Sequence, residues 1–308
     1  MVEISVISPI YGTPELIPVL CSRVKSALES LALEYELILV FDCSPDEGWK
    51  RIQEECRNDS HVKGIKLSRN FGQHAAITAG LEAASGNWIV IMDCDLQDMP
   101  EEIPRLFQVA SEGYDIVLAQ RSVRVDGFLR KAVSSMFYRV LGYMTDSELD
   151  ASIANFGIYH RKVINAMLSM KDKTRFFPMM VQWVGFRSKK VPVKHARREL
   201  GKTNYTWSAL FKLAFSSMLS FSDKPLRLTV GLGMCMCSIT VLIGCFYLLR
   251  YLAGGITVSG FASLILSIWF LSGIIIFILG IVGLYLARIF QQVKDRPVYI
   301  VDNKENLG

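Results

Sequence analysis

The sequence predicts an α/β domain with a mostly parallel β-sheet, followed by two C-terminal transmembrane helices. Over residues 1 to about 120, short β-branched and apolar runs alternate with helical patterns, which is the signature of βαβ units. Two later apolar runs, at 228–252 and 261–289, are far longer than a buried core helix requires. A chain of 308 residues has room for one such domain and a membrane appendage.

The predicted elements of the α/β domain follow one another without a repeat or a low-complexity linker. In chain order, the expected strands are Ile4–Pro9, Leu37–Phe41, Lys63–Leu67, Trp88–Met92 and Asp115–Ala119, and the expected helices are Pro14–Leu33, Glu47–Asn58 and His74–Ala84. The alternation of strand and helix predicts one compact domain with parallel central strands.

The two long apolar runs predict membrane spans, because a bilayer core needs about 20 apolar residues per helix. The alternative is a pair of buried helices in a soluble protein, which would not need this length. Basic residues flank the outer ends of the pair, at Lys224 and Arg227 before it and at Arg288, Lys294 and Arg296 after it. By the positive-inside rule, we expect a multi-pass protein of the cell inner membrane with both termini in the cytoplasm.

The composition narrows the functional classes. The formal net charge of +5 is mild, and anionic lipid headgroups explain basic residues beside membrane spans, so no nucleic-acid binding is expected. The seven cysteines show neither metal nor disulfide spacing, which fits a reduced cytosolic compartment. The first residues lead directly into a strand, and no signal peptide is predicted.

Acidic residues follow the strand at Trp88–Met92 directly. Asp93, Asp95 and Gln97 lie just beyond its end, and ligands of α/β sheets bind beyond the carboxyl ends of the strands. Residues two positions apart point to the same side of an extended backbone. Such oxygen atoms suit a hard divalent cation that shares its coordination with substrate phosphates. Asp98 ends the same acidic run, and its carboxylate is expected either to join this cluster or to cap the next helix.

Seven short segments carry a resemblance over nearly the whole chain. They are ISPIYGTPE (7–15), VFDCSPD (40–46), LSRNFGQHAAITAGL (67–81), MDCDLQDMPEEI (92–103), AQR (119–121), RRELGKTNY (197–205) and, after the two spans, RPVYIV (296–301). Together they resemble the family-2 glycosyltransferases that load polyprenyl phosphate, such as bactoprenol glucosyltransferases and dolichyl-phosphate mannose synthase. The resemblance implies a GT-A nucleotide-sugar domain and an inverting reaction, in which polyprenyl phosphate attacks the anomeric carbon of a UDP- or GDP-linked sugar.

The resemblance also implies a donor site. Pro9, Tyr11 and Asp42 would line the nucleotide pocket. Asp93 would face the ribose or the metal, and Asp95 with Gln97 would hold Mg²⁺ or Mn²⁺ against the diphosphate. The metal would then neutralise charge that develops on the leaving group, which makes Asp95 a catalytic residue.

The acceptor side calls for cations. Four residues fall where the family binds the lipid phosphate, and they are Arg121, Arg130, Ser134 and Arg198. Guanidinium groups suit phosphate oxygens, and Arg198, which begins an R-x-x-G match, is expected to contribute to catalysis.

Two positions depart from the family pattern. Phe41 and Asp42 stand where the family often has paired aspartates, and Asn155 stands where it often has a single aspartate. An amide cannot act as a general base, but a phosphate acceptor is already ionised at neutral pH. We therefore assign no catalytic base.

These expectations define a domain organisation. The divisions are a cytoplasmic GT-A domain at 1–205 with an interfacial helix at 127–144, a juxtamembrane amphipathic helix at 206–227, two transmembrane helices at 228–290 and a cytoplasmic tail at 291–308. The amphipathic patterns would also suit helices that pack on a core, but a position just before a span favours the membrane interface.

Two other functions compete with polyprenyl-phosphate glycosylation. A processive polysaccharide synthase needs a Q-x-x-R-W segment and usually more spans, whereas Trp183 here follows Gln182 directly. A membrane scaffold with an inactive sugar-nucleotide domain would not need the acidic cluster or Arg198. The sequence leaves open the identity of the sugar, the nucleotide base and whether the protein forms a homo-oligomer.

Overall fold

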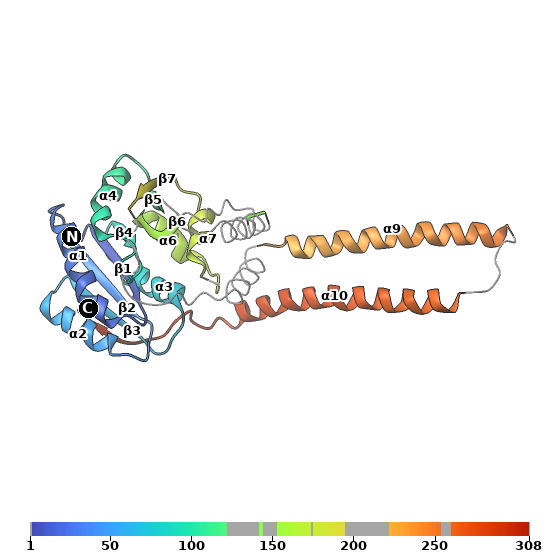
Figure 1. Cartoon of the computed structure of the whole chain (residues 1–308), viewed down its shortest axis with the longest axis horizontal. Helices are drawn as coiled ribbons and strands as arrows, with labels where there is room; N and C mark the ends of the chain where they lie inside the picture. The colour runs from blue at the N-terminus through green and yellow to red at the C-terminus, as the bar shows by residue number, and fades with distance from the viewer. Residues whose placement is uncertain are drawn as a thin grey trace. The chain divides into compact units, whose positions relative to one another are not determined.

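The computed structural model describes residues 2–121, 142–143, 153–173, 175–194, 222–253 and 260–307. The chain divides into two compact units (Figure 1). The α/β unit takes in residues 1–140, 147–206 and 296–308, and the helical unit takes in 141–146 and 207–295.

The α/β unit contains strands and helices in alternation over its first half. Its described strands are β1 (Ile4–Ile10), β2 (Tyr35–Phe41), β3 (Val62–Leu67), β4 (Trp88–Ile91), β5 (Ile116–Arg121), β6 (Ile153–His160), β7 (Ser188–Val193) and β8 (Val301–Glu305). Its described helices are η1 (Pro14–Leu16), α1 (Ile17–Glu29), α2 (Gly48–Asn58), α3 (Gln73–Ala83), η2 (Pro100–Glu102), α4 (Ile103–Ser111), α6 (Arg161–Ser169) and α7 (Phe177–Trp183).

The described strands form one sheet in the order β7-β5-β6-β4-β1-β2-β3-β8. Its centre is parallel, because β1 pairs in parallel with β2 and β4, and β2 pairs in parallel with β3. Strand β6 runs antiparallel to β4 and β5, and β8 runs antiparallel to β3. The predicted α/β class with a mostly parallel sheet is therefore confirmed, and all five predicted strands are present with small shifts in their ends.

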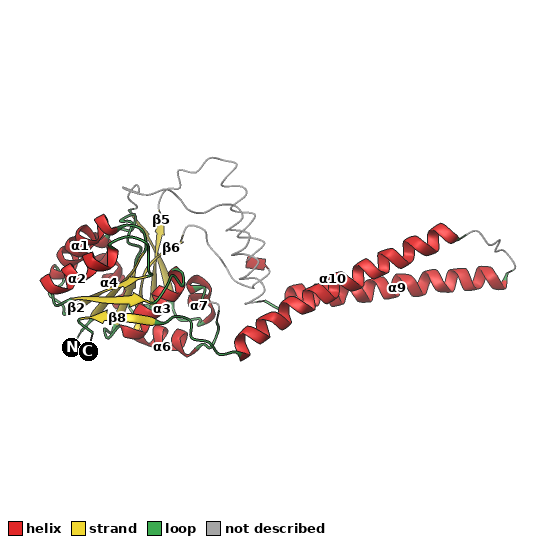
Figure 2. Cartoon of the chain, turned by 90° about the horizontal axis from the view of Figure 1, so that it is seen from below, coloured by secondary structure: helices red, strands yellow, loops and turns green. Residues whose placement is uncertain are grey.

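Helices cover both faces of the sheet (Figure 2). Helix α1 buries apolar residues at helical spacing, from Ile17 and Leu20 to Val24 and Leu28, and these pack in one cluster with alternate residues of β1 and β2. Helix α3 packs on the opposite face, where a Cβ atom at Gly80 would lie 2.4 Å from Ile7 Cγ2. This close approach explains why glycine occupies the middle of a helix despite its low helix propensity.

The C-terminal segment returns to the sheet. Residues 296–308, which the sequence indicated only as a tail, belong to the α/β unit, and β8 pairs with β3 from Gly64 to Leu67. Asn306 Nδ2 donates to the carbonyl oxygens of Cys56 and Val62 at 2.6 and 2.9 Å. The β8 sequence VDNKE is mostly polar and shows no apolar periodicity, which is why the sequence did not predict this strand.

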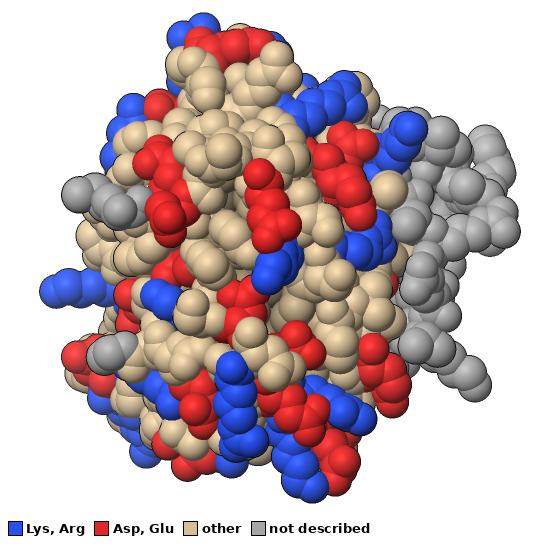
Figure 3. Space-filling model, turned by 90° about the vertical axis from the view of Figure 1, so that its left-hand side faces the viewer, with Lys and Arg blue, Asp and Glu red and all other residues tan. Residues whose placement is uncertain are grey.

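Charged side chains of both signs are interspersed on the face of the molecule in Figure 3. In the α/β unit, ion pairs join Arg23 to Glu101 at 2.8 Å and Lys66 to Asp302 at 2.7 Å. Exposed pairs of this kind contribute little to stability. The visible face offers no extended basic surface.

The helical unit contains α9 (Lys224–Leu252) and α10 (Phe261–Val293). Both are long and apolar enough to cross a membrane, with mean hydropathy 1.9 over Lys224–Ile243 and 2.6 over Ser267–Val293. Buried residues make up 6 % and 0 % of these two windows, unlike the core helix of a soluble protein. The helices therefore have the length, composition and exposure of membrane spans. Helix α9 begins before residue 228, so it includes the end of the predicted juxtamembrane segment.

Candidate active site

Polar residues follow three adjacent strands, at the edge of the sheet that is formed by the carboxyl ends of the strands. Strands β4, β1 and β2 are neighbours and run in parallel, so the residues that follow them meet at their carboxyl ends. Tyr11 follows β1 and is 48 % exposed, whereas Asp42 after β2 is buried. Asp93 follows β4, and Pro9 is buried within β1. The structure thus brings the predicted donor residues to the same edge.

Asp42 organises the loop that precedes α3. Its two carboxylate oxygens accept hydrogen bonds from the backbone N–H groups of Phe71 at 2.7 Å and Gly72 at 2.8 Å. Gly72 has φ +94°, a conformation that glycine adopts without steric cost. Burial raises the pKa of Asp42, and the two N–H donors and the charge of Arg69 oppose that rise. The family resemblance predicts that Asp42 lines the nucleotide pocket, and in the structure its carboxylate holds the backbone of Phe71 and Gly72 beside that edge.

The acidic cluster is fixed by two different contacts. The side-chain amide of Gln73 donates to Asp93 Oδ1 at 2.6 Å. The carboxylate of Asp95 is largely buried and accepts the backbone N–H of Gln97 at 3.2 Å. Strand β4 ends at Ile91, and Cys94 and Asp95 lie in a turn that Leu96 follows at φ +58°. The extended backbone predicted for Asp93 to Asp95 therefore ends before Asp95.

A neighbouring contact ties this turn to the end of β1. Thr13 Oγ1 and Cys94 Sγ lie 3.2 Å apart, and burial raises the pKa of the Cys94 thiol. The thiol therefore stays protonated at neutral pH and acts as a packing group rather than a nucleophile. Asp98 is buried too, but Met99 holds the N-cap position of η2 and no side chain caps it.

The donor atoms at this edge suit a hard cation that a substrate helps to ligate. Among the residues that the structure describes, no three His, Cys, Asp or Glu side chains gather in a metal-binding group. Asp93 and Asp95 alone would leave most of the coordination sphere to other oxygens. Mg²⁺ is usually bound by one or two carboxylates together with substrate phosphates. Asp93 and Asp95 therefore fit such an ion.

Strands β5 and β6 add residues to the same edge. Ile91 of β4 is paired with Gly157 of β6 in antiparallel register, and two residues further along lie Asp93 and Asn155. Asn155 is therefore expected beside Asp93. Strand β5 also runs antiparallel to β6, so Arg121 lies at its carboxyl end, at this edge. Of the other acceptor residues, Arg130, Ser134 and Arg198 lie outside the described part of the chain, as do most of 127–144 and residues 206–221.

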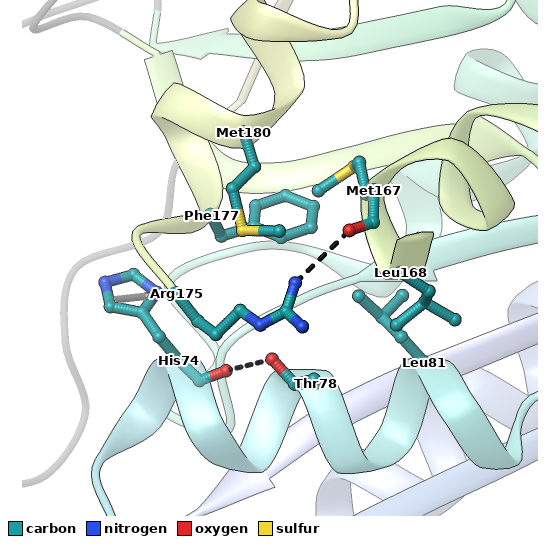
Figure 4. Close-up of a pocket in the computed structure, with 8 residues that line it drawn as sticks. All are labelled: His74, Thr78, Leu81, Met167, Leu168, Arg175, Phe177 and Met180. Carbon is teal, nitrogen blue, oxygen red and sulfur yellow. Dashed lines mark hydrogen bonds between the residues drawn. The ribbon is translucent and has the colours of Figure 1, made fainter. Parts of the chain in front are cut away.

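A small cavity lies beside this region, between α3, α6 and α7 (Figure 4). Its volume of about 10 Å³ is at the lower limit for one water molecule, so it cannot hold a nucleotide sugar. Arg175 crosses it and donates to the Met167 carbonyl at 3.2 Å. The Nδ1 atom of His74 is buried without a hydrogen-bond partner among the described residues, and burial lowers the pKa of His74 to about 4.

The fold places the chain in a class. A solved structure of glucosyl-3-phosphoglycerate synthase from Mycobacterium tuberculosis, in complex with Mn²⁺, UDP-glucose and phosphoglyceric acid, is similar with a TM-score of 0.50 and 16 % sequence identity. The similarity covers 71 % of this chain and 79 % of that one. The α/β unit therefore has the fold of a GT-A glycosyltransferase.

Sequence comparison then defines the family. Residues 5–171 match glycosyl transferase family 2. The glycosyltransferase YkcC of Bacillus subtilis, of uncharacterised function, is 37 % identical over 99 % of this chain and 95 % of its own length. The undecaprenyl-phosphate 4-deoxy-4-formamido-L-arabinose transferase of Proteus mirabilis is 34 % identical over 97 % of this chain and 93 % of its own. The chain belongs to glycosyl transferase family 2, and the predicted family and enzyme class are confirmed.

Sequence reasoning did not identify Gln73 or Thr13 as parts of the site. The signal for Gln73 was available in the run SRNFGQ (68–73), where a glycine precedes a polar residue at the start of a helix. Its partner Asp93 is 20 residues away, so the contact depends on the strand order rather than on local spacing.

Proposed function

We propose that the protein transfers a sugar from a nucleotide sugar to polyprenyl phosphate at the cytoplasmic membrane face, giving a polyprenyl-phosphate sugar and a nucleoside diphosphate. One observation carries this proposal: the same chain contains acidic residues at the carboxyl ends of its parallel strands and two apolar helices long enough to cross a membrane. The relative from Proteus mirabilis, whose name gives undecaprenyl phosphate as its acceptor, aligns over both parts.

The donor would bind at the carboxyl ends of β1, β2 and β4. Tyr11 and Pro9 border the place of the nucleoside, and Asp93, Asp95 and Gln97 are the residues that would hold a divalent metal, Mg²⁺ or Mn²⁺. When bound, the metal neutralises charge on the departing diphosphate. The similar synthase from Mycobacterium tuberculosis binds Mn²⁺ and UDP-glucose, which supports a donor of this class.

The acceptor phosphate would bind beside this place. Arg121 lies at the end of β5, and we propose that Arg130, Ser134 and Arg198 join it around the lipid phosphate. Cationic groups orient a phosphate oxygen for attack. Because this oxygen is already ionised, no general base has to remove a proton from it. Inversion at the anomeric carbon follows from one direct displacement, with the diphosphate leaving on the opposite side.

Purified full-length protein tests the proposal. The protein is incubated with undecaprenyl phosphate and one nucleotide sugar at a time, and both nucleoside diphosphate release and the lipid product are measured. We expect one sugar per lipid, formed only when divalent metal is present. A lipid that carries a growing chain would indicate a processive synthase, and no turnover with any donor would indicate an inactive scaffold.

Reporter fusions test the proposed membrane orientation. Basic residues flank both outer ends of the helix pair, so a reporter after residue 308 should be cytoplasmic and one within 254–260 should be external. A C-terminal reporter outside the cytoplasm would contradict the cytoplasmic location of the reaction.

A further inference from the structure

One side chain joins the loop after β3 to the acidic cluster after β4. The Nε2 atom of Gln73 lies 2.6 Å from Asp93 Oδ1. An ionised carboxylate accepts hydrogen bonds and cannot donate them, so the amide NH₂ group of Gln73 must face it. Because the acceptor is charged, this bond belongs to the stronger class of protein hydrogen bonds.

The backbone of this loop is held from its other side. Asp42 binds the N–H groups of Phe71 and Gly72, and α3 begins at Gln73. Asp42 follows β2 and Asp93 follows β4, with β1 between these two strands. The segment from Phe71 to Gln73 therefore spans the carboxyl end of β1 and contacts a carboxylate on each side.

We propose that Gln73 is a positioning residue that holds the Asp93 carboxylate in the orientation in which it receives the nucleotide-sugar donor. This inference rests on the proposed function, because it concerns the same donor site. A carboxylate that is oriented before binding loses less conformational entropy when the donor arrives, and a site is held accurately when side chains behind it fix its contacting groups. Gln73 needs no contact of its own with the donor.

The competing role for the bond is purely structural, as a link between α3 and the end of β4. The two roles differ in what a substitution changes. A structural link affects the stability of the fold and leaves donor affinity unchanged, whereas a positioning residue affects the dissociation constant of the donor. A matched pair of glutamines separates them, because Gln53 donates to Glu305 at 2.7 Å in the same type of bond but next to β8, at the far edge of the sheet from β4.

The test compares Gln73→Met, Gln73→Glu and the control Gln53→Met in the full-length protein. Binding of UDP and of GDP is measured by calorimetry with Mn²⁺ present, thermal unfolding is measured in parallel, and KM for the donor is measured separately from kcat. Methionine has a similar length to glutamine but cannot donate, and glutamate places a second negative charge beside Asp93.

We expect Gln73→Met to weaken nucleoside diphosphate binding about two- to tenfold, because an Asp93 side chain without this hydrogen bond must be immobilised when the donor binds. Gln73→Glu should weaken it further, and Gln53→Met should leave it unchanged. Donor KM should rise with little change in kcat. Unchanged affinity in Gln73→Met, with the wild type binding normally, would overturn the inference alone. A wild type that binds no nucleoside diphosphate and transfers no sugar would overturn the proposed function, and the inference with it.

Discussion

The phenolic hydroxyl of Tyr299 donates a hydrogen bond of 2.5 Å to Glu82, near the end of α3. Burial and the Glu82 carboxylate both raise the pKa of Tyr299, so the hydroxyl remains protonated and able to donate. The bond adds to the pairing of β8 with β3 and attaches the segment after α10 to the α/β unit. The chain that follows α10 therefore continues into an edge strand of the sheet of the α/β unit.

Weakening this attachment should destabilise the α/β unit. Asn306→Gly removes two hydrogen bonds to backbone carbonyls but keeps the φ of +57° available. We expect it to lower the free energy of unfolding by about 1–3 kcal/mol, and Tyr299→Phe by about 1 kcal/mol. Thermal unfolding of the purified protein measures both. The exposed change Lys304→Ala serves as the control, and equal stability in all three variants would contradict the attachment.

His74 should make stability depend on pH. Burial lowers its pKa from 6.5 to about 4, so between these values the unfolded chain binds a proton that the folded chain does not. Stability should therefore fall as the pH falls from 6.5 towards 4, by roughly 3 kcal/mol in all. Unfolding measured across this range in wild type and in His74→Gln tests the effect. The variant should lose that part of the slope, and identical slopes would show that His74 does not titrate in this way.

The central strands were predictable because their sequences carry the information locally. β1 and β2 are runs of buried residues, as expected for strands covered by helices on both faces. The sequences VDNKE of β8 and SKKVPV of β7 are polar or mixed, and only their partners in the sheet make them strands. A single sequence shows no such pairing, so these elements were not predicted.

In the candidate site, too, some features could be predicted from the local sequence and others could not. Asp93 and Asp95 could be located because acidic residues after an apolar strand are visible in the sequence. The bonds that hold them were not visible, because Gln73 reaches Asp93 from another loop and Asp42 binds backbone 29 and 30 residues away. Local sequence indicates which groups can do chemistry, whereas the strand order determines which groups orient them.

Asp95 should be required for metal-dependent turnover. Asp95→Asn keeps an oxygen that can accept the Gln97 N–H but removes the charge that would bind the cation. We expect it, and Asp95→Ala, to abolish turnover, and Gln97→Ala to reduce it more mildly. Activity with Mn²⁺ and calorimetric binding of Mn²⁺ with nucleoside diphosphate measure the effect. Asp302→Asn, on β8, is the control, and wild-type activity that survives excess EDTA would contradict a metal role.

Arg130 and Arg198 should act on the acceptor. If each guanidinium contacts the lipid phosphate, its removal costs on the order of 1.5–3 kcal/mol, or roughly ten- to a hundredfold in transfer. Donor binding should change far less. Lysine should restore only part of the rate, because it keeps the charge and loses the two-pronged geometry. Transfer rates at varied polyprenyl phosphate, compared with calorimetric donor binding, separate the two effects, and equal losses in both would assign these arginines to the donor.

Asn155 tests whether the acceptor needs to lose a proton. The register of β4 and β6, extended two residues beyond the pair Ile91–Gly157, leads us to expect Asn155 beside Asp93, where a carboxylate could act as a general base towards a substrate. If the acceptor is an ionised phosphate, Asn155→Asp should not produce the roughly 10²- to 10⁴-fold gain expected when a general base is restored. The added negative charge beside Asp93 should instead weaken binding of the anionic donor. Turnover and donor affinity of this variant, measured with polyprenyl phosphate, decide the point. A gain of that size would show that proton removal limits the rate, and that the acceptor is a hydroxyl rather than a phosphate.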